Sequence, residues 1–172
     1  ENCIIIDSES KRYSMCGVRI GFLVIRSQSL HNAAMLFAQA RLSPVLIGQI
    51  LATAAHNDDA EYINSVREEY TKRRNLLVEL LNEIPGVKCP KPKGAFYCVA
   101  ELPVEDADDF AQWMLESFSD NGETVMVAPA SGFYSQPELG KKQVRIAYVL
   151  KSEDLKRSVE LLKLALEKYN NK

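Results

Sequence analysis

Residues 8–21 read SESKRYSMCGVRIG and separate two apolar runs that we interpret as strands. The first run, Cys3–Ile6, is continuously apolar, and the second, Val18–Ile25, is apolar on both faces except for Arg19. Strands that are apolar on both faces are typical of a sheet that is covered on both sides. We therefore predict two buried strands, joined by a polar loop that contains a lysine.

Lys11 lies in this loop, just after the first predicted strand ends. Ligands often bind at the ends of buried strands, and a desolvated lysine amine can form an imine with an aldehyde. The hydroxyls of Ser8, Ser10 and Ser14 and the guanidinium of Arg19 would complete a donor set suited to a phosphate joined to an aldehyde. The alternative is a solvated lysine, which is the commoner state of this side chain in a polar loop.

Arg19 is stronger evidence for an anion-binding site than Lys11 is. A guanidinium inside an apolar strand is costly to bury unless an anion pairs with it. Asp7 and Glu9 are the only acids near it in the sequence. Either one of them is its partner, or Arg19 binds an anionic ligand.

Residues 8–21 also resemble the pyridoxal-phosphate (PLP) attachment segment of class I/II aminotransferases. That segment runs S-x-S-K, followed by an aromatic residue two positions after the lysine, then Met, Gly, Arg and Gly. The resemblance implies that Lys11 binds the cofactor aldehyde and later moves the substrate proton, and that Ser8, Ser10 and Arg19 bind the cofactor. Glu9 departs from the pattern, since the family usually has an apolar or aromatic residue there, and Cys16 stands where threonine is common.

Two further stretches resemble the same family. Residues 92–97 (PKGAFY) match its P-x-G-A-F-Y segment, which implies that Gly94 and Phe96 lie at the substrate mouth. Without the resemblance, Gly94 permits a tight entry into a strand and Phe96 is better interpreted as a core residue. Residues 125–133 (VMVAPASGF) match a V-x-V-x-P-G-x-x-F loop, with Ala130 at the usual glycine position.

Arg145 is the second candidate for binding an anion. It shares a predicted strand face with Ala147 and Val149. An arginine on such a face either pairs with a nearby acid or binds a ligand carboxylate at two points, and the residues alone favour the internal pair. The resemblance favours the ligand, since the family has an arginine on the strand before the last helix that holds the α-carboxylate of the amino acid.

The remaining pattern predicts an α+β layer in which helices cover one side of a small sheet. The helices expected from apolar spacing and breakers run from Leu30 to about Arg41, through Ile47–Ala54, from Ala60 to Ile84 with a cap at Asp58 or Asp59, around Phe110–Phe118, and from a Ser152 cap to the end. The strands expected are Val87–Cys89, Ala95–Ala100, Thr124–Ala128 and Val144–Leu150.

The resemblance covers nearly the whole chain and implies the fold of a PLP enzyme of fold type I. Residues 1–58 would be the closing segment of the α/β large domain, and residues 59–172 the α+β small domain. The family also implies a homodimer with shared active sites. Because residue 1 is not methionine and an apolar run starts at Cys3, we suspect a piece of a longer protein.

Composition excludes several functions. With 21 basic and 23 acidic side chains the net charge is -2, so no basic excess indicates nucleic acid or an anionic membrane. No apolar run approaches the ~18 residues that span a bilayer. Four scattered cysteines and two histidines, His31 and His56, make a metal site improbable, and we expect buried free thiols in the cytoplasm and histidines at the surface or at caps.

The expected function is PLP-dependent transfer of an amino group between an amino acid and a 2-oxo acid, with an aspartate aminotransferase as the first hypothesis. The groups that the family uses to hold the ring and its nitrogen are expected upstream of residue 1, so residues 1–172 alone should be inactive. Arg41 could reach a second substrate carboxylate, although a solvated arginine is the preferred interpretation. The alternatives are a β-lyase or decarboxylase of the same fold, or a non-catalytic dimerisation or regulatory domain.

Overall fold

The computed structural model describes residues 3–57 and 60–171. The chain divides into two compact units, Glu1–Arg67 and Glu68–Lys172, and the division falls within helix α4 (Ala60–Asn82). The domain boundary predicted from the sequence lies just before this helix. Its assignment to a large and a small domain stays a prediction, and the proposed caps Asp58 and Asp59 lie outside the described residues.

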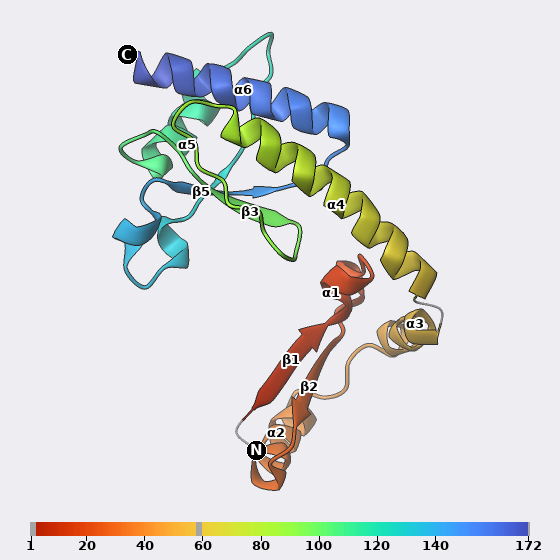
Figure 1. Ribbon diagram of the computed structural model, residues 1–172. Helices are drawn as coiled ribbons and strands as arrows, with labels where there is room; N and C mark the ends of the chain where they lie inside the picture. Colours follow the sequence, from red (N-terminus) through yellow and green to blue (C-terminus); the bar gives the residue numbers. More distant parts are fainter. Residues whose placement is uncertain (1–2, 58–59, 172) are drawn as a thin grey trace. The chain divides into compact units, whose positions relative to one another are not determined.

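The first unit is built on an antiparallel hairpin of β1 (Ile4–Ser8) and β2 (Gly21–Ile25) (Figure 1). The register ends with Ser8 opposite Gly21, so the polar loop predicted from the sequence closes the hairpin. The elements that complete the unit are α1 (Glu9–Arg12) and η1 (Cys16–Val18) in the loop, and α2 (Gln28–Ala40) and α3 (Leu46–Asn57) after it.

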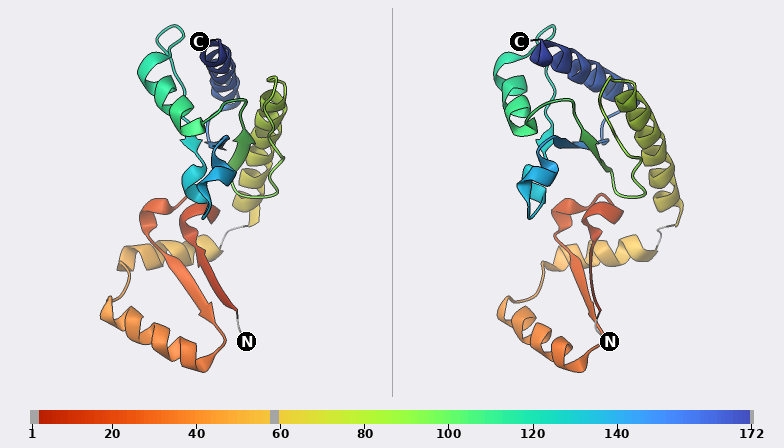
Figure 2. Two further views of the ribbon diagram at one scale, coloured as in Figure 1. Left: turned by 90° about the vertical axis from the view of Figure 1, so that its left-hand side faces the viewer. Right: turned by 60° about the vertical axis from the view of Figure 1, so that its left-hand side comes forward.

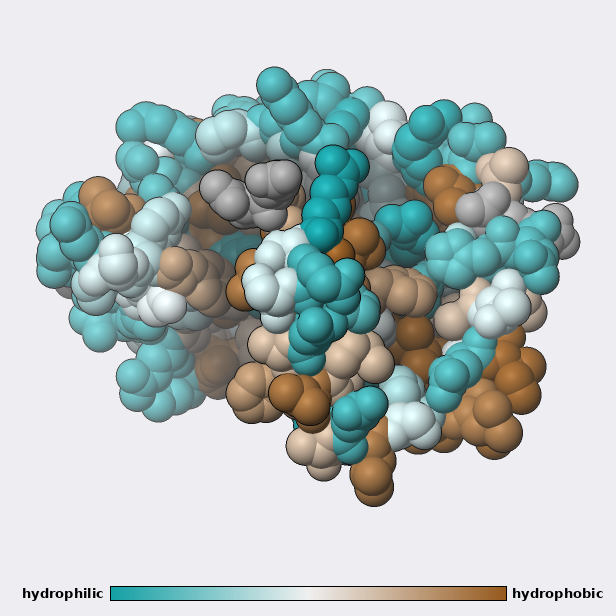
Figure 3. Space-filling view, turned by 90° about the horizontal axis from the view of Figure 1, so that it is seen from below, coloured by the Kyte–Doolittle hydropathy of each residue, from teal (hydrophilic) through white to brown (hydrophobic). Residues whose placement is uncertain are grey.

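The prediction that these strands are buried is wrong for the described chain. Ile5 and Ile6 on β1 and Leu23 and Val24 on β2 are all exposed, because a sheet of two strands has no layer over either face. Apolar side chains of α2 and α3 are exposed as well, and apolar residues gather in brown patches on the surface that Figure 3 presents. An isolated hairpin is marginally stable in water and is stabilised when other elements pack on it. This apolar surface is therefore suited to packing against further protein.

The second unit contains a three-stranded antiparallel sheet in the order β3 (Tyr97–Glu101), β5 (Gln143–Ala147), β4 (Ala128–Pro129). One face of the sheet, with Cys98, Ala100 and Val144, is buried in the core. The opposite face carries Val99 and Arg145, which are paired across β3 and β5 and are both exposed.

The helices of this unit pack on the buried face, as the sequence predicted (Figure 2). The core joins the C-terminal half of α4 to α5 (Ala107–Ser117) and α6 (Ser152–Asn170) through Leu81, Met114 and Leu162, all nearly inaccessible to solvent. The short helices η2 (Ser131–Phe133) and η3 (Pro137–Gly140) lie between β4 and β5 in the sequence.

Several predicted elements differ in detail. Lys88 makes only one bridge to Glu101, so Val87–Cys89 is not a strand, and β4 contains only the last residue of the predicted Thr124–Ala128. Ser152 is the first residue of α6 and does not cap it, because the helix starts with the bond from the Leu155 N–H to the Lys151 carbonyl at 2.9 Å. A side-chain cap occurs instead on α5, where the Asp106 carboxylate accepts bonds from the N–H groups of Asp108 and Asp109.

Met114 tests the core of the second unit. Its side chain is 0% exposed, whereas its neighbour Leu115 on α5 is 55% exposed. We expect Met114→Ala to lower the free energy of unfolding by about 2–5 kcal/mol through the lost burial and the cavity. Leu115→Ala, the matched control, should change it by less than about 0.5 kcal/mol. Denaturant titration followed by the fluorescence of the single tryptophan measures both, and equal effects would contradict the packing described.

The four thiols are free, as predicted, but only Cys89 and Cys98 are buried, while Cys3 and Cys16 are exposed. A hydrogen bond from Cys98 lowers the pKa of Cys89, and that bond together with burial raises the pKa of Cys98. Within residues 3–57 and 60–171, no group of three His, Cys, Asp or Glu side chains could hold a metal ion. In the same ranges no helix has the length and apolar character needed to cross a bilayer.

Candidate functional site

The closed end of the hairpin holds the predicted lysine site. Ser8 is the last residue of β1, and Ser10 and Lys11 follow on the single turn of α1. Because Ser8 pairs with Gly21 and the Glu9 N–H donates to the Ile20 carbonyl at 3.2 Å, the turn lies beside the start of β2. A Cβ added to Gly21 would lie 3.1 Å from the Asp7 carbonyl oxygen, so glycine suits this close approach of the two strands.

Arg19 is exposed and lies outside β2, so the prediction of a buried strand arginine is wrong. Pairing with β1 stops at Gly21, and the chain before it turns through η1, where Arg19 adopts a left-handed conformation with φ 60° and ψ 39°. Its Nη1 donates to the Cys16 carbonyl at 2.8 Å. Among the described residues no carboxylate pairs with this guanidinium, and its charge remains available for an anion.

The two acids near Arg19 in sequence have other partners. Asp7 pairs with Arg12 at 2.5 Å and also accepts a bond from the Ser8 N–H at 2.8 Å. Glu9 is 1% exposed, and its Oε1 lies 2.8 Å from Nε2 of His56 on α3. Neither of the internal pairs considered for Arg19 therefore forms.

His56 is exposed, as predicted, but its contact with Glu9 was not predicted. The hydroxyl of Tyr13 lies 3.4 Å from Nδ1 of the same imidazole, so His56 links two residues that flank Lys11. Glu9 Oε2 is buried and has no hydrogen-bond partner in the described part of the chain. The only signal in the sequence was Glu9 itself, a charged residue where the resemblance leads one to expect an apolar one.

The residues at the hairpin end fit a phosphate joined to an aldehyde. Lys11 offers an amine, Ser8 and Ser10 offer half-buried hydroxyls, and Arg19 offers a guanidinium on an exposed turn. The hydroxyl of Ser14, which was also considered, accepts a bond from Tyr62 at 3.3 Å. This donor set supplies one group for the aldehyde and three for the phosphate.

The second unit contains the residues predicted at the substrate mouth. Phe96 is half-buried and stacks on Tyr70 with ring centroids 5.6 Å apart, which supports its interpretation as a core residue. A Cβ added to Gly94 would meet nothing within 4 Å, and the left-handed conformation in this loop falls on Ala95, with φ 59°. Gly94 is therefore not required by the backbone of the loop.

Arg145 lies on the exposed face of the sheet and contacts two aromatic rings. Its guanidinium carbon lies 4.7 Å from the centroid of the Tyr97 ring and 4.9 Å from that of Phe133. No carboxylate in the described ranges pairs with it, so the internal ion pair favoured by the residues alone is not found. Tyr97 was not predicted here, although the two-residue period of β3 places it on the same face as Val99, the partner of Arg145.

The loop that carries Phe133 is anchored through Ala130. This residue occupies the family's glycine position but has φ −103° and ψ −1°, which any residue adopts, so the substitution causes no backbone strain. It is fully buried, and its N–H donates to the Gln143 carbonyl on β5 at 2.9 Å. The glycine that the loop requires is Gly140, since a Cβ there would clash with the Ala130 carbonyl and lie 2.7 Å from Cδ2 of Tyr134.

We expect Gly140→Ala to lower the free energy of unfolding by about 1–3 kcal/mol, because the backbone of Ala130 must shift to admit the methyl group. Gly132→Ala is the matched control in the same loop, where an added Cβ meets nothing within 4 Å. Thermal denaturation of both variants measures the difference. A Gly140→Ala protein as stable as the control would show that the loop does not pack as described.

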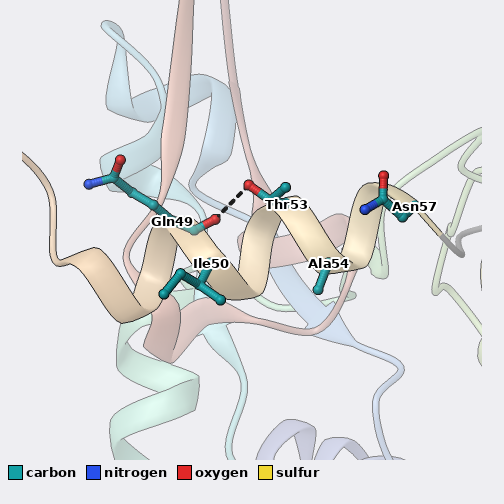
Figure 4. Close-up of a pocket in the computed structure, with 5 residues that line it drawn as sticks. All are labelled: Gln49, Ile50, Thr53, Ala54 and Asn57. Carbon is teal, nitrogen blue, oxygen red and sulfur yellow. Dashed lines mark hydrogen bonds between the residues drawn. The ribbon is translucent and has the colours of Figure 1, made fainter.

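A hollow lies on one face of α3 (Figure 4). It is lined by Gln49, Ile50, Thr53, Ala54 and Asn57, and the Thr53 hydroxyl donates to the Gln49 carbonyl at 2.9 Å. None of these side chains is ionisable or strongly nucleophilic, and none was predicted at a site. The hollow therefore offers surface for contact and no group for catalysis.

Comparisons with known proteins, by family model, by sequence and by structure, all find aminotransferases. The family model of aminotransferase class I and II matches residues 1–162. The chain is 33% identical to an aspartate aminotransferase of Bacillus subtilis (strain 168), covering 99% of this chain and 42% of that protein. An aspartate aminotransferase of Pyrococcus horikoshii is 30% identical, with coverages of 97% and 42%.

Solved structures agree with the sequence relatives. The crystal structure of an aromatic aminotransferase from Pyrococcus horikoshii OT3 superposes with a TM-score of 0.81 at 29% identity, covering 97% of this chain and 43% of that one. The chain thus spans less than half the length of the relatives it matches. Its two units have the architecture of part of a fold type I enzyme, as the resemblance implied.

Proposed function

Since the chain belongs to the aminotransferase class I and II family, we propose that it is part of a PLP-dependent enzyme that moves an amino group between an amino acid and a 2-oxo acid. The observation that carries the proposal is the closed end of the hairpin. There an amine, two hydroxyls and a guanidinium without a carboxylate partner among the described residues occur between the end of β1 and the start of β2.

Each group has a role that follows from its chemistry. The amine of Lys11 would hold PLP through its aldehyde, and the same side chain would move the proton of the substrate α-carbon. The guanidinium of Arg19 and the hydroxyls of Ser8 and Ser10 would hold the phosphate. When bound, PLP supplies the electron sink that makes the α-proton acidic.

The second unit supplies the recognition of the substrate in this proposal. Arg145 would bind the α-carboxylate with its planar fork, since among the described residues no acid forms an ion pair with it. Gly94 would border the substrate mouth, and the neighbouring Phe96 would do so only at the edge of its ring, since the ring stacks on Tyr70. We propose aspartate as the amino donor because relatives at 33% and 30% identity are named aspartate aminotransferases. A homodimer in the reducing cytoplasm completes the proposal, and free thiols are compatible with that compartment.

Residues 1–172 alone are expected to be inactive and to bind PLP weakly at best. The chain spans 42% of the relatives' length, and the exposed apolar faces of the hairpin leave the cofactor groups on an uncovered sheet. A turnover of about 1 per second or more by this segment alone, mixed with PLP and an amino acid, would contradict this expectation.

Absorbance spectra of the full-length protein test the function. The protein should contain bound PLP that absorbs near the edge of the visible range. Adding aspartate should remove this band, and adding a 2-oxo acid should restore it with release of a new amino acid. Loss of the band with release of carbon dioxide or of a β-substituent would indicate a decarboxylase or a β-lyase. A full-length protein that binds no PLP would refute the proposal.

A further inference from the structure

The guanidinium of Arg145 lies between two elements that each bring an aromatic ring to it. We propose that Tyr97 and Phe133 are positioning residues, which restrain this guanidinium so that its N–H groups can bind the carboxylate of an amino acid or a dicarboxylate. The inference rests on the proposed function, since it takes the ligand of Arg145 to be a carboxylate. It adds two residues that determine how strongly that carboxylate binds.

An exposed arginine without an acidic partner needs some other restraint to be a good binding group. Its side chain loses as much as ~2 kcal/mol of rotamer entropy when it is fixed, and a ligand that orders it must supply that free energy. The two ring centroids lie within 4.9 Å of the guanidinium carbon, inside the range of a cation–π contact. The rings therefore reduce the freedom of the arginine before a ligand arrives.

Tyr97 is placed by the sheet itself. In the β3–β5 register, Val99 lies opposite Arg145 and Tyr97 opposite Ala147, so the tyrosine is a diagonal neighbour of the arginine on the same face. Diagonal neighbours lie within reach of aromatic and long side chains. The Tyr97 ring also contacts Phe96, with centroids 4.5 Å apart, and this contact supports it from the side of the core.

Phe133 is 54% exposed, yet its backbone is tied to the strand that carries Arg145. Its N–H donates to the Ala130 carbonyl at 3.0 Å, and Ala130 is itself bonded to Gln143 on β5. The next residue, Tyr134, donates its hydroxyl to the Gln143 side chain at 2.7 Å. Burial contributes little stability to a phenyl ring at this exposed position. The contact with Arg145 therefore accounts better for its placement.

The chemistry of the three groups favours a carboxylate as the ligand. Ring faces attract the cation but do not compete for its N–H groups in the way a carboxylate does. In the described ranges no acid pairs with Arg145, so its donors remain available for a planar anion that accepts two parallel bonds. A substrate without a carboxylate next to the reacting carbon would gain nothing from this arrangement.

The test uses the full-length enzyme loaded with PLP and four variants, Phe133→Leu, Tyr97→Leu, Tyr97→Phe and Leu139→Ala. Calorimetry gives the Kd of maleate, an unreactive dicarboxylate, and steady-state kinetics give KM and kcat for aspartate. We expect each leucine variant to raise Kd and KM about fivefold to twentyfold with kcat changed less than about twofold. Tyr97→Phe keeps the ring and should restore both constants, and Leu139→Ala, an exposed apolar truncation nearby, should leave them unchanged.

Arg145→Ala separates the inference from the function on which it rests. If this substitution leaves the Kd of maleate unchanged, the proposed role of Arg145 fails and the inference fails with it. If Arg145→Ala weakens binding but the leucine variants do not, only the inference is overturned. In the double variants, the ring substitutions should have no further effect once Arg145 is alanine. Equal ring effects in both backgrounds would mean that the rings contact the ligand themselves, and would also overturn the inference.

Discussion

In the full-length enzyme, Lys11→Ala is expected to lower kcat for transamination by about 10³-fold or more. In the proposed function, the substitution removes the amine that would bond to the cofactor aldehyde and move the α-proton, and a positioned acid–base group alone contributes about 10²–10⁴-fold. Steady-state assays with aspartate and a 2-oxo acid measure the loss. PLP should still bind, because Arg19 and the serine hydroxyls that hold the phosphate remain in place.

Lys156→Ala provides the control for this experiment. Lys156 is exposed on α6 of the second unit, and its loss removes the same charge and the same side-chain length while the hairpin sequence stays unchanged. It should retain full activity. If the Lys11→Ala enzyme kept more than a tenth of the normal kcat, the catalytic role of Lys11 would be wrong and a non-catalytic role for this chain would be favoured.

The elements of the second unit could be predicted because their signals are local. Apolar spacing located α5 and α6, and two-residue alternation located β3 and β5, since each element buries one face in a core that this chain completes. The errors are the predicted strand Val87–Cys89, which makes only a single bridge, and the ends of other elements. Ser152 is a good cap by type, but the choice between capping and starting a helix depends on which carbonyl accepts the first bond, and sequence spacing does not determine that.

The hairpin could be predicted in position but not in environment. Its apolar strands indicated a covered sheet, whereas burial depends on layers that the described chain does not contain. Arg19 was misplaced for a related reason, since the start of β2 is set by pairing with Ser8 and not by the apolar run. The contact of Glu9 with His56 joins residues from α1 and α3, and no local pattern reports such a pairing.

Arg145 was identified from the sequence, but its neighbours were not. The resemblance drew attention to Phe96, while the alternation of β3 turns that ring toward Tyr70 and presents Tyr97 to the arginine. Phe133 comes from a loop whose path depends on Gly140 packing against Ala130. A candidate binding residue on a strand is thus predictable from its type, whereas the side chains around it depend on contacts between elements.

Arg145→Ala is expected to raise KM for aspartate about 10²–10⁴-fold, and kcat should fall less. The estimate follows from the loss of two charge-assisted hydrogen bonds, each contributing about 1.5–3 kcal/mol when well formed. The substitution should change KM more than kcat, because the carboxylate keeps the same charge during the transfer of the amino group. Steady-state kinetics over a wide range of aspartate concentration measure both constants.

Arg145→Lys refines this prediction because it keeps the charge and removes the planar fork. Lysine is a compact cation that cannot make two parallel bonds to one carboxylate, so KM should recover only part of the way, to about tenfold above normal. Neither substitution should change the reaction of a simple amine that lacks a carboxylate. If the lysine variant matched the natural enzyme, a positive charge alone would explain binding, and the geometry that the two rings impose on Arg145 would have no consequence for the substrate.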